Sequence, residues 1–192
     1  MMTQLLPSDL EYIEGIRQWA HQQHANVNHL YDGKPYGIAH LDPVVDVLCR
    51  YEYIFDSPRY GGTATAIQRV KVLSICAALC HDILEDTHNS YNDLVKVVGV
   101  EVADIVFALT NLRGKTRHEK AGPEYYELLR NTPYASLIKI CDRIANVENS
   151  IQSGNSMAAK YARENEHFTA ELFRYHLLEP LNDLKQLFVN IK

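Results

Sequence analysis

The sequence predicts an all-α fold, a helical bundle in a single domain covering residues 1–192. Three observations support it. Apolar residues recur at helical intervals, no stretch alternates apolar and polar residues as a strand would, and no repeat or low-complexity tract interrupts the pattern. The 192 residues are enough for one substantial core but cramped for two. The first apolar stripe consists of Ile13, Ile16, Trp19 and Ala20.

The N-terminal segments have recognisable start and turn signals. Ser8, with Glu11 three residues later, predicts a capping box that begins the first helix. Residues 26–35 are polar and rich in turn-forming residues, so they predict a loop. The next helix is expected to begin around His40, with Pro43 near its first turn, where a missing N–H costs least.

Later helix boundaries follow from the same signals. Ser90 predicts a helix start and Gly99 a stop, which gives two short helices up to residue 110. Thr132, followed by a proline, predicts the N-cap of a long apolar helix. Residues 157–178 predict another long helix, and Pro180 is expected to separate it from a final amphipathic one.

Composition excludes several classes of protein. The net charge of −5 argues against a nucleic-acid polymer as ligand. No apolar run is long enough to span a membrane and the first residues lack a signal-peptide pattern, so a soluble, cytoplasmic protein is expected. The cysteines lie in apolar helical runs without a Cys-x-x-Cys pair, which predicts reduced, buried thiols rather than disulfides or a zinc knuckle: Cys49, Cys76, Cys80 and Cys141.

The stretch from His81 to Asp86 carries the strongest chemical signal. His81 and Asp82 offer an imidazole nitrogen and a carboxylate oxygen to one metal ion, a mixed set that suits Mn, Fe, Zn or Mg. If the preceding helix continues, Glu85 and Asp86 follow one turn later, so four polar side chains share one edge. The alternative for Glu85 and Asp86 is a solvated helix end.

Two further residues interrupt apolar helices and complete a possible metal site. His40 and Asp142 join His81 and Asp82 to give two imidazoles and two carboxylates, which leaves open positions for water and a substrate oxygen. Asp142 beside so much apolar surface needs an ion-pair partner or a metal. Asn146 lies one turn after Asp142 and can face the same space.

Two other polar groups remain open to more than one interpretation. His21 and His24, three residues apart, could share a metal, but without a nearby carboxylate they are expected to be partly exposed helix residues. The basic segment 113–120 is expected to be a solvated loop, with a phosphate-binding segment as the alternative.

Four segments, in order, resemble the motifs of the HD-domain phosphohydrolases, and most closely those of the RelA/SpoT-type alarmone hydrolases, which include the stand-alone metazoan SpoT homologues. Residues 33–40 resemble the Pro-Tyr-x-x-His segment, and residues 79–87 the His-Asp-x-x-Glu-Asp-Thr block. Residues 99–112 are similar to the segment after that block, and residues 137–146 to the closing Lys-x-Ala-Asp-Arg-x-x-Asn motif. The resemblance spans residues 19–149 and implies an HD-type bundle, which the helices of residues 157–191 complete.

The resemblance also implies roles for individual residues. It assigns a divalent metal, usually manganese in this family, to His40, His81, Asp82 and Asp142. Glu85 and Asp86 match the pair that positions and deprotonates the attacking water, and Asn146 matches a residue of the nucleotide pocket. Candidates for offsetting phosphate charge are Lys34, Lys139, Arg143, Lys115 and Arg117.

The implied activity is metal-dependent hydrolysis of a nucleotide phosphate or pyrophosphate ester, with guanosine 3′,5′-bis(diphosphate) 3′-pyrophosphate hydrolysis as the first expectation. Residues 28–31 lack the Arg-Lys element that alarmone hydrolases carry, and residues 147–149 also depart from their pattern. A dNTP, a phosphorylated dinucleotide and a non-catalytic nucleotide-sensing module therefore stay as alternatives. The oligomeric state is open, because the last helix can close the core or pair with a second copy through Leu181, Leu184, Leu187 and Phe188.

Overall fold

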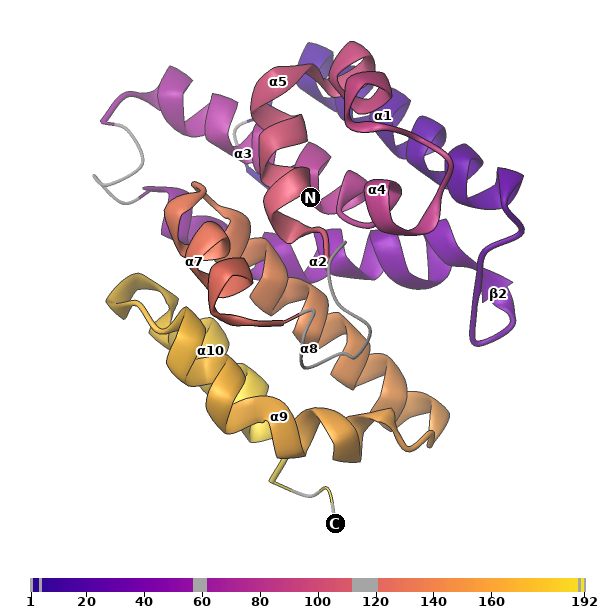
Figure 1. Cartoon of the computed structure of the whole chain (residues 1–192). Coiled ribbons are helices and arrows are strands. Elements are labelled where there is room, and N and C mark those ends of the chain that lie inside the picture. Colours follow the sequence, from indigo (N-terminus) through magenta and orange to yellow (C-terminus); the bar gives the residue numbers. More distant parts are fainter. Residues whose placement is uncertain (1, 4, 57–61, 112–120, 190, 192) are drawn as a thin grey trace.

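The computed structural model describes residues 2, 3, 5–56, 62–111, 121–189 and 191. The predicted all-α fold is confirmed, with a single two-stranded hairpin among these residues (Figure 1). The basic segment 113–120 lies outside the described residues. The helices are α1 (Pro7–Asn26), α2 (Asp42–Arg50), α3 (Ala64–Cys80), α4 (Ile83–Asp86), α5 (Tyr91–Leu109), α7 (Pro123–Asn131), α8 (Ala135–Ser153), α9 (Met157–Leu172) and α10 (Leu178–Leu187). Shorter elements are β1 (Leu30–Tyr31), β2 (Lys34–Pro35), the π-helical turn η1 (Gly37–Leu41), and the 3-10 turns η2 (Glu52–Asp56) and η4 (Tyr175–Leu177).

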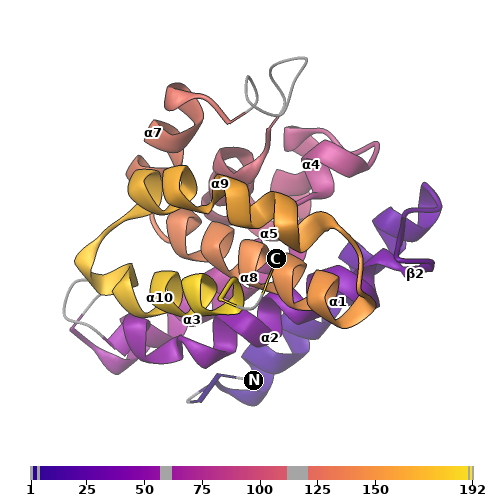
Figure 2. The same cartoon turned by 90° about the horizontal axis from the view of Figure 1, so that it is seen from below.

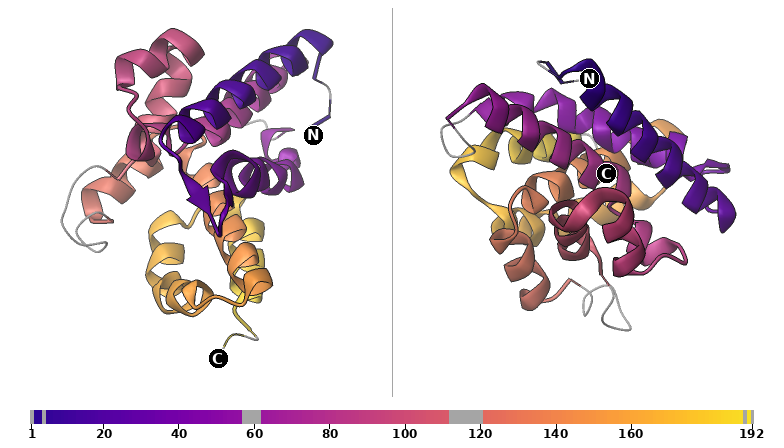
Figure 3. Two further views of the ribbon diagram at one scale, coloured as in Figure 1. Left: turned by 90° about the vertical axis from the view of Figure 1, so that its right-hand side faces the viewer. Right: turned by 90° about the horizontal axis from the view of Figure 1, so that it is seen from above.

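Helix α8 runs through the middle of the molecule. It packs against α2 on one side and against α9 and α10 on the other, so that the last two helices form an outer layer (Figures 1 and 2). Helices α1 and α3 lie side by side on the opposite face (Figure 3). The buried apolar residues of α8 join a core that is continuous across these layers. They are Ala135, Leu137, Ile138, Ile140, Cys141, Ile144, Ala145 and Val147.

The final helix closes the core. Leu181 and Leu184 of α10 are buried, and Leu187 and Phe188 pack against the same core. This is the first of the two roles that the sequence left open for this helix. No helix among the described residues combines the length and the apolar character required to cross a bilayer.

The predicted free thiols are confirmed. All four cysteines are free, and three are buried: Cys76, Cys80 and Cys141. Cys49 is only half-buried, which differs from the expectation. Burial raises the pKa of the Cys76 thiol to about 12, so this side chain behaves as a small apolar group.

Helix α1 begins earlier than predicted. Pro7 occupies the first turn, where it loses no hydrogen bond, and the carboxylate of Asp9 accepts a hydrogen bond from the backbone N–H of Leu6 at 2.9 Å. The capping box predicted at Ser8 and Glu11 is therefore wrong, because the helix has already started when the chain reaches Ser8.

The loop predicted for residues 26–35 contains a hairpin instead. Strands β1 and β2 pair antiparallel, with Leu30 opposite Pro35 and Tyr31 opposite Lys34. The two residues between them have positive φ angles, 48° at Asp32 and 76° at Gly33. An Asp-Gly pair with this backbone is the favoured two-residue hairpin turn. The strands are too short to show an alternating pattern.

The boundary predicted at Gly99 is confirmed, because its φ of 79° and ψ of 167° are not helical and divide α5 into two helical segments. Two later boundaries differ from the predictions. The N–H of Thr132 still bonds to Leu128 of the preceding helix, so α8 begins only at Ala135. Helix α9 ends at Leu172, and Pro180 lies in the first turn of α10, where a proline is tolerated, rather than between two helices.

Two serines at helix starts allow a matched test of capping. The Ser90 hydroxyl accepts a hydrogen bond from the N–H of Asp93 at 3.3 Å, whereas Ser156 at the start of α9 makes no such bond. We expect Ser90→Ala to lower the free energy of unfolding by about 1 kcal/mol. Ser156→Ala should change it by less than about 0.5 kcal/mol. Urea denaturation measures both changes in the free energy of unfolding. Equal decreases in the two variants would contradict the assignment of Ser90 as a capping residue.

Candidate metal centre

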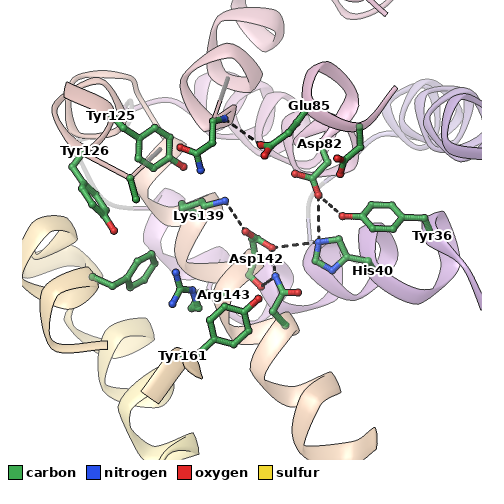
Figure 4. Close-up of a pocket in the computed structure, with 15 residues that line it drawn as sticks. Tyr36, His40, Asp82, Glu85, Tyr125, Tyr126, Lys139, Asp142, Arg143 and Tyr161 are labelled. Carbon is green, nitrogen blue, oxygen red and sulfur yellow. Dashed lines mark hydrogen bonds and ion pairs between the residues drawn. The ribbon is translucent and has the colours of Figure 1, made fainter. Parts of the chain in front are cut away.

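Residues from distant parts of the chain meet at one point. The ligand atoms of His40, His81 and Asp142 all lie within 4.8 Å of one another. The Nε2 atoms of the two histidines are 3.2 Å apart. Nε2 of His40 is 3.3 Å from Oδ1 of Asp142 (Figure 4). Asp82 joins them, with its Oδ2 at 2.8 Å from Nε2 of His81 and 3.6 Å from Nε2 of His40. The structure thus brings together all four residues predicted as metal ligands.

The donor set fits a divalent metal ion. Nδ1 of His81 lies 2.8 Å from the carbonyl oxygen of Ala78, which can only accept, so in the neutral ring Nε2 carries the lone pair and faces the cluster. Burial alone would lower the pKa of His40, but the hydrogen bonds and charges of Asp142 and Asp82 outweigh it and raise this pKa to about 9. The cluster therefore favours positive charge at its centre, which a divalent cation would supply.

The carboxylates of the cluster are held in the ionised form. Burial alone would raise the pKa of Asp82, but His81 and His40 outweigh it and keep that pKa well below its usual value. The hydroxyl of Tyr36 also donates a hydrogen bond to Asp82. Burial alone would also raise the pKa of Asp142. The main group that keeps this pKa low is Lys139, whose Nζ lies 2.8 Å from Oδ2 of Asp142.

A break in the helix directs the acidic side chains. Helix α3 ends at Cys80 and a single turn, α4, begins at Ile83, so the helix does not continue through Asp86. The carbonyl oxygen of Asp82 accepts hydrogen bonds from the N–H groups of Glu85 at 3.2 Å and Asp86 at 2.9 Å, so both follow Asp82 within one turn. Both side chains line the cavity beside the cluster, and both also remain exposed to solvent. Burial, together with the charges of Asp82 and Glu85, raises the pKa of Asp86 to about 6.

His40 lies on a π-helical turn that packs against α1. The ring of His21 occupies the space beside Gly37, where an added Cβ would lie 2.3 Å from its Cδ2 atom. Nε2 of His21 lies 3.2 Å from Oδ1 of Asp42, which also pairs with Arg17. These contacts join α1 to the turn that presents His40. A π-helical turn is a common feature of functional sites.

His21 and His24 do not act as a pair. His21 contacts Asp42, whereas the ring of His24 is fully buried and stacks on Tyr36 with 4.5 Å between ring centroids. The expectation that His24 is partly exposed is therefore wrong. Nδ1 of His24 lies 3.0 Å from Nδ1 of His29, and burial lowers the pKa of His24 to about 4, so it is neutral. The sequence offered no signal for this stack, since it joins α1 to the hairpin.

The cluster forms one end of a cavity of about 440 Å³. Its other end is aromatic and includes Tyr125, Tyr126, Tyr161 and Phe168 (Figure 4). The guanidinium of Arg143 lies between two of these rings, 4.5 Å from the centroid of Tyr161 and 4.4 Å from that of Phe168, and pairs with Glu164 at 3.2 Å. Sequence patterns gave no signal for this aromatic wall, because its members come from two separate helices, α7 and α9.

The predicted phosphate-binding cations divide into three groups. Lys139 and Arg143 line the cavity, and Asn146 lies beside them. Lys34 is exposed on β2 and does not line it. Lys115 and Arg117 lie outside the described residues.

The chain is similar to alarmone hydrolases. It is 32% identical over 103 residues, 52% of its length, to the guanosine-3′,5′-bis(diphosphate) 3′-pyrophosphohydrolase of Aquifex aeolicus. It is 30% identical over 73 residues, 38% of its length, to the enzyme of the same name from Drosophila melanogaster. The matched segments span only 15% and 41% of those two proteins. No model of a known protein family matches the chain. The resemblance inferred from the motifs is thus confirmed by two relatives that are both named as hydrolases.

The packing at Gly37 predicts the effect of one added methyl group. Gly37→Ala should lower the free energy of unfolding by about 1–3 kcal/mol, because the new Cβ forces the His21 ring or the turn carrying His40 to move. Gly15→Ala is the control, since Gly15 lies within α1 with open space around it and alanine favours the helix by about 1 kcal/mol. Thermal denaturation should show opposite signs for the two variants.

Proposed function

We propose that this protein is a metal-dependent phosphohydrolase that cleaves a phosphate or pyrophosphate ester of a nucleotide. The observation that carries the proposal is the meeting of two imidazoles and two carboxylates at one end of a cavity whose other end is aromatic. Guanosine 3′,5′-bis(diphosphate), cleaved at its 3′-pyrophosphate, is the substrate we propose first, because both relatives are named for that reaction.

His40, His81, Asp82 and Asp142 would hold the cation. When bound, it supplies Lewis-acid chemistry, polarising a phosphoryl oxygen and increasing the acidity of water. We propose manganese, and iron, zinc and magnesium accept the same mixed nitrogen and oxygen ligands. The cytoplasm is the proposed location, since free thiols suit a reducing compartment.

Glu85 and Asp86 handle the proton of the attacking water in this proposal. The water oxygen forms a bond to phosphorus, its proton passes to one of these carboxylates, and the bond from phosphorus to the nucleotide oxygen breaks. The departing oxygen takes up a proton to become a hydroxyl. Both carboxylates line the cavity within one turn of Asp82, which supports this role.

The rest of the cavity would bind the nucleotide. The aromatic side chains offer faces on which a base can stack, and Lys139 and Arg143 lie near enough to contact its phosphates. Asn146 lines the same cavity, and we propose that it lies beside the bound nucleotide.

Product release from a nucleotide panel tests the activity. With Mn²⁺ present, the wild type should release pyrophosphate from guanosine 3′,5′-bis(diphosphate), and Asp82→Ala should reduce the rate to background because a ligand is lost. Release of phosphate or pyrophosphate from a dNTP or a phosphorylated dinucleotide instead would support the proposed hydrolysis but change the proposed substrate. No release from any nucleotide would contradict the proposed enzymatic activity and favour a nucleotide-sensing module.

Isosteric variants separate proton transfer from metal binding. Glu85→Gln and Asp86→Asn retain the shape of each side chain, so we expect the affinity for Mn²⁺ to stay within a few-fold and kcat to fall by about 10²–10⁴-fold for the residue that accepts the proton. Glu166→Gln, an exposed change on α9, is the control. Unchanged kcat in both site variants would exclude the proposed role.

Metal binding should also be visible without substrate. A cation that binds only the folded chain stabilises it by about 2.7 kcal/mol at a concentration a hundredfold above its dissociation constant. Differential scanning calorimetry should therefore show that Mn²⁺ raises the Tm of the wild type, that a chelator reverses the rise, and that His81→Ala abolishes it. A wild-type Tm indifferent to Mn²⁺, Fe²⁺, Zn²⁺ and Mg²⁺ would count against the site.

A further inference from the structure

One side chain of the β1–β2 hairpin contacts one candidate metal ligand directly and a second one through a neighbouring residue. The ring of Tyr31 stacks on the ring of His40, with 5.0 Å between centroids and 26° between planes. Its hydroxyl lies 2.6 Å from Oδ1 of Asn146, and Nδ2 of Asn146 lies 2.5 Å from Oδ1 of Asp142. Tyr31 therefore connects a ligand near the N-terminal helix with one on α8.

The direction of these hydrogen bonds is determined by chemistry. The amide nitrogen of Asn146 also lies 3.0 Å from the carbonyl oxygen of Asp142, so both of its partners there are acceptors. The amide must then turn its NH₂ group toward Asp142 and its oxygen toward Tyr31, which leaves the hydroxyl of Tyr31 as the donor. The chain of bonds runs in one direction, from Tyr31 through Asn146 to Asp142.

The hairpin is fixed in the position that this contact requires. Nδ2 of Asn149 donates a hydrogen bond to Oδ2 of Asp32 at 2.6 Å. Asn149 follows Asn146 by three residues on α8, so both face the hairpin from the same side of the helix. The Asp-Gly turn and the pairing of Tyr31 with Lys34 hold the strand that carries the ring.

We propose that Tyr31 is a positioning residue of the metal centre, holding the ring of His40 by stacking and the carboxylate of Asp142 through Asn146. The inference rests on the metal centre of the proposed function. The carboxylates of Asp82 and Asp142 approach the same Nε2 atom of His40, at 3.6 and 3.3 Å, so their ligand geometry needs support from neighbouring groups. Removing such outer hydrogen bonds costs about 10–100-fold in metal affinity.

The decisive variant is Tyr31→Phe, which keeps the ring and removes only the hydroxyl. We expect its affinity for Mn²⁺, measured by isothermal titration calorimetry on the whole chain, to fall about tenfold while circular dichroism shows an unchanged fold. Tyr31→Leu also removes the stacking on His40 and should bind Mn²⁺ more weakly still. Tyr53→Phe is the matched control, because it removes a hydroxyl that donates to Glu179 at 2.7 Å, outside the cavity.

A double-mutant cycle tests the path through Asn146. In an Asn146→Ala background the bond from Tyr31 has already been lost, so adding Tyr31→Phe should lower the affinity for Mn²⁺ by less than about twofold. The inference is wrong if the Tyr31→Phe variant binds Mn²⁺ within twofold of the wild type. It is also wrong if Tyr31→Phe lowers the Mn²⁺ affinity equally in the wild-type and Asn146→Ala backgrounds.

Activity assays on the same variants distinguish this inference from the proposed function. If Mn²⁺ affinity follows the expected pattern but the wild type cleaves no nucleotide, the positioning role of Tyr31 is supported and the proposed enzymatic activity is wrong. If the wild type cleaves a nucleotide but Tyr31→Phe retains full Mn²⁺ affinity, only the positioning role fails. A wild type without affinity for any of Mn²⁺, Fe²⁺, Zn²⁺ and Mg²⁺ would overturn both.

Discussion

Two carboxylates, Asp142 buried and Asp82 partly buried, lie close to two imidazoles, and the rest of this structure depends on that constraint. Ionised groups removed from water are costly unless opposite charge and hydrogen bonds compensate them. Here Tyr36 compensates Asp82 and Lys139 compensates Asp142, and a divalent cation would complete the balance. Helix α8 is central for the same reason, since it carries both Asp142 and the lysine that neutralises part of its charge.

Irregular backbone concentrates around this cluster. His40 is presented by a π-helical turn, and His81 and Asp82 occupy the break between α3 and α4. A continuous helix would direct these side chains along one edge, whereas the break lets a histidine, an aspartate and the following acidic pair approach the cavity together. Departures from regular helix geometry are expected where function, rather than local propensity, determines the chain.

The cavity combines two kinds of surface. One end is acidic and suited to a cation, and the other is aromatic and includes a guanidinium held between two rings. Arg143 also joins α8 to α9 through its ion pair with Glu164, and Tyr161 and Phe168 of α9 line the cavity. Helix α9 is therefore part of the site as well as a cover for the core.

The sequence by itself determined the helical fold and the identity of the polar residues at the cluster. Helical periodicity is a local property, and His40, His81, Asp82 and Asp142 are conspicuous because they interrupt apolar runs. It did not determine where helices such as α1 and α9 begin or end, because neighbouring packing shifts those limits. Only the tertiary structure decided the bond between Tyr31 and Asn146, whose positions are 115 residues apart, because side chains so distant in sequence meet only once the whole core has formed.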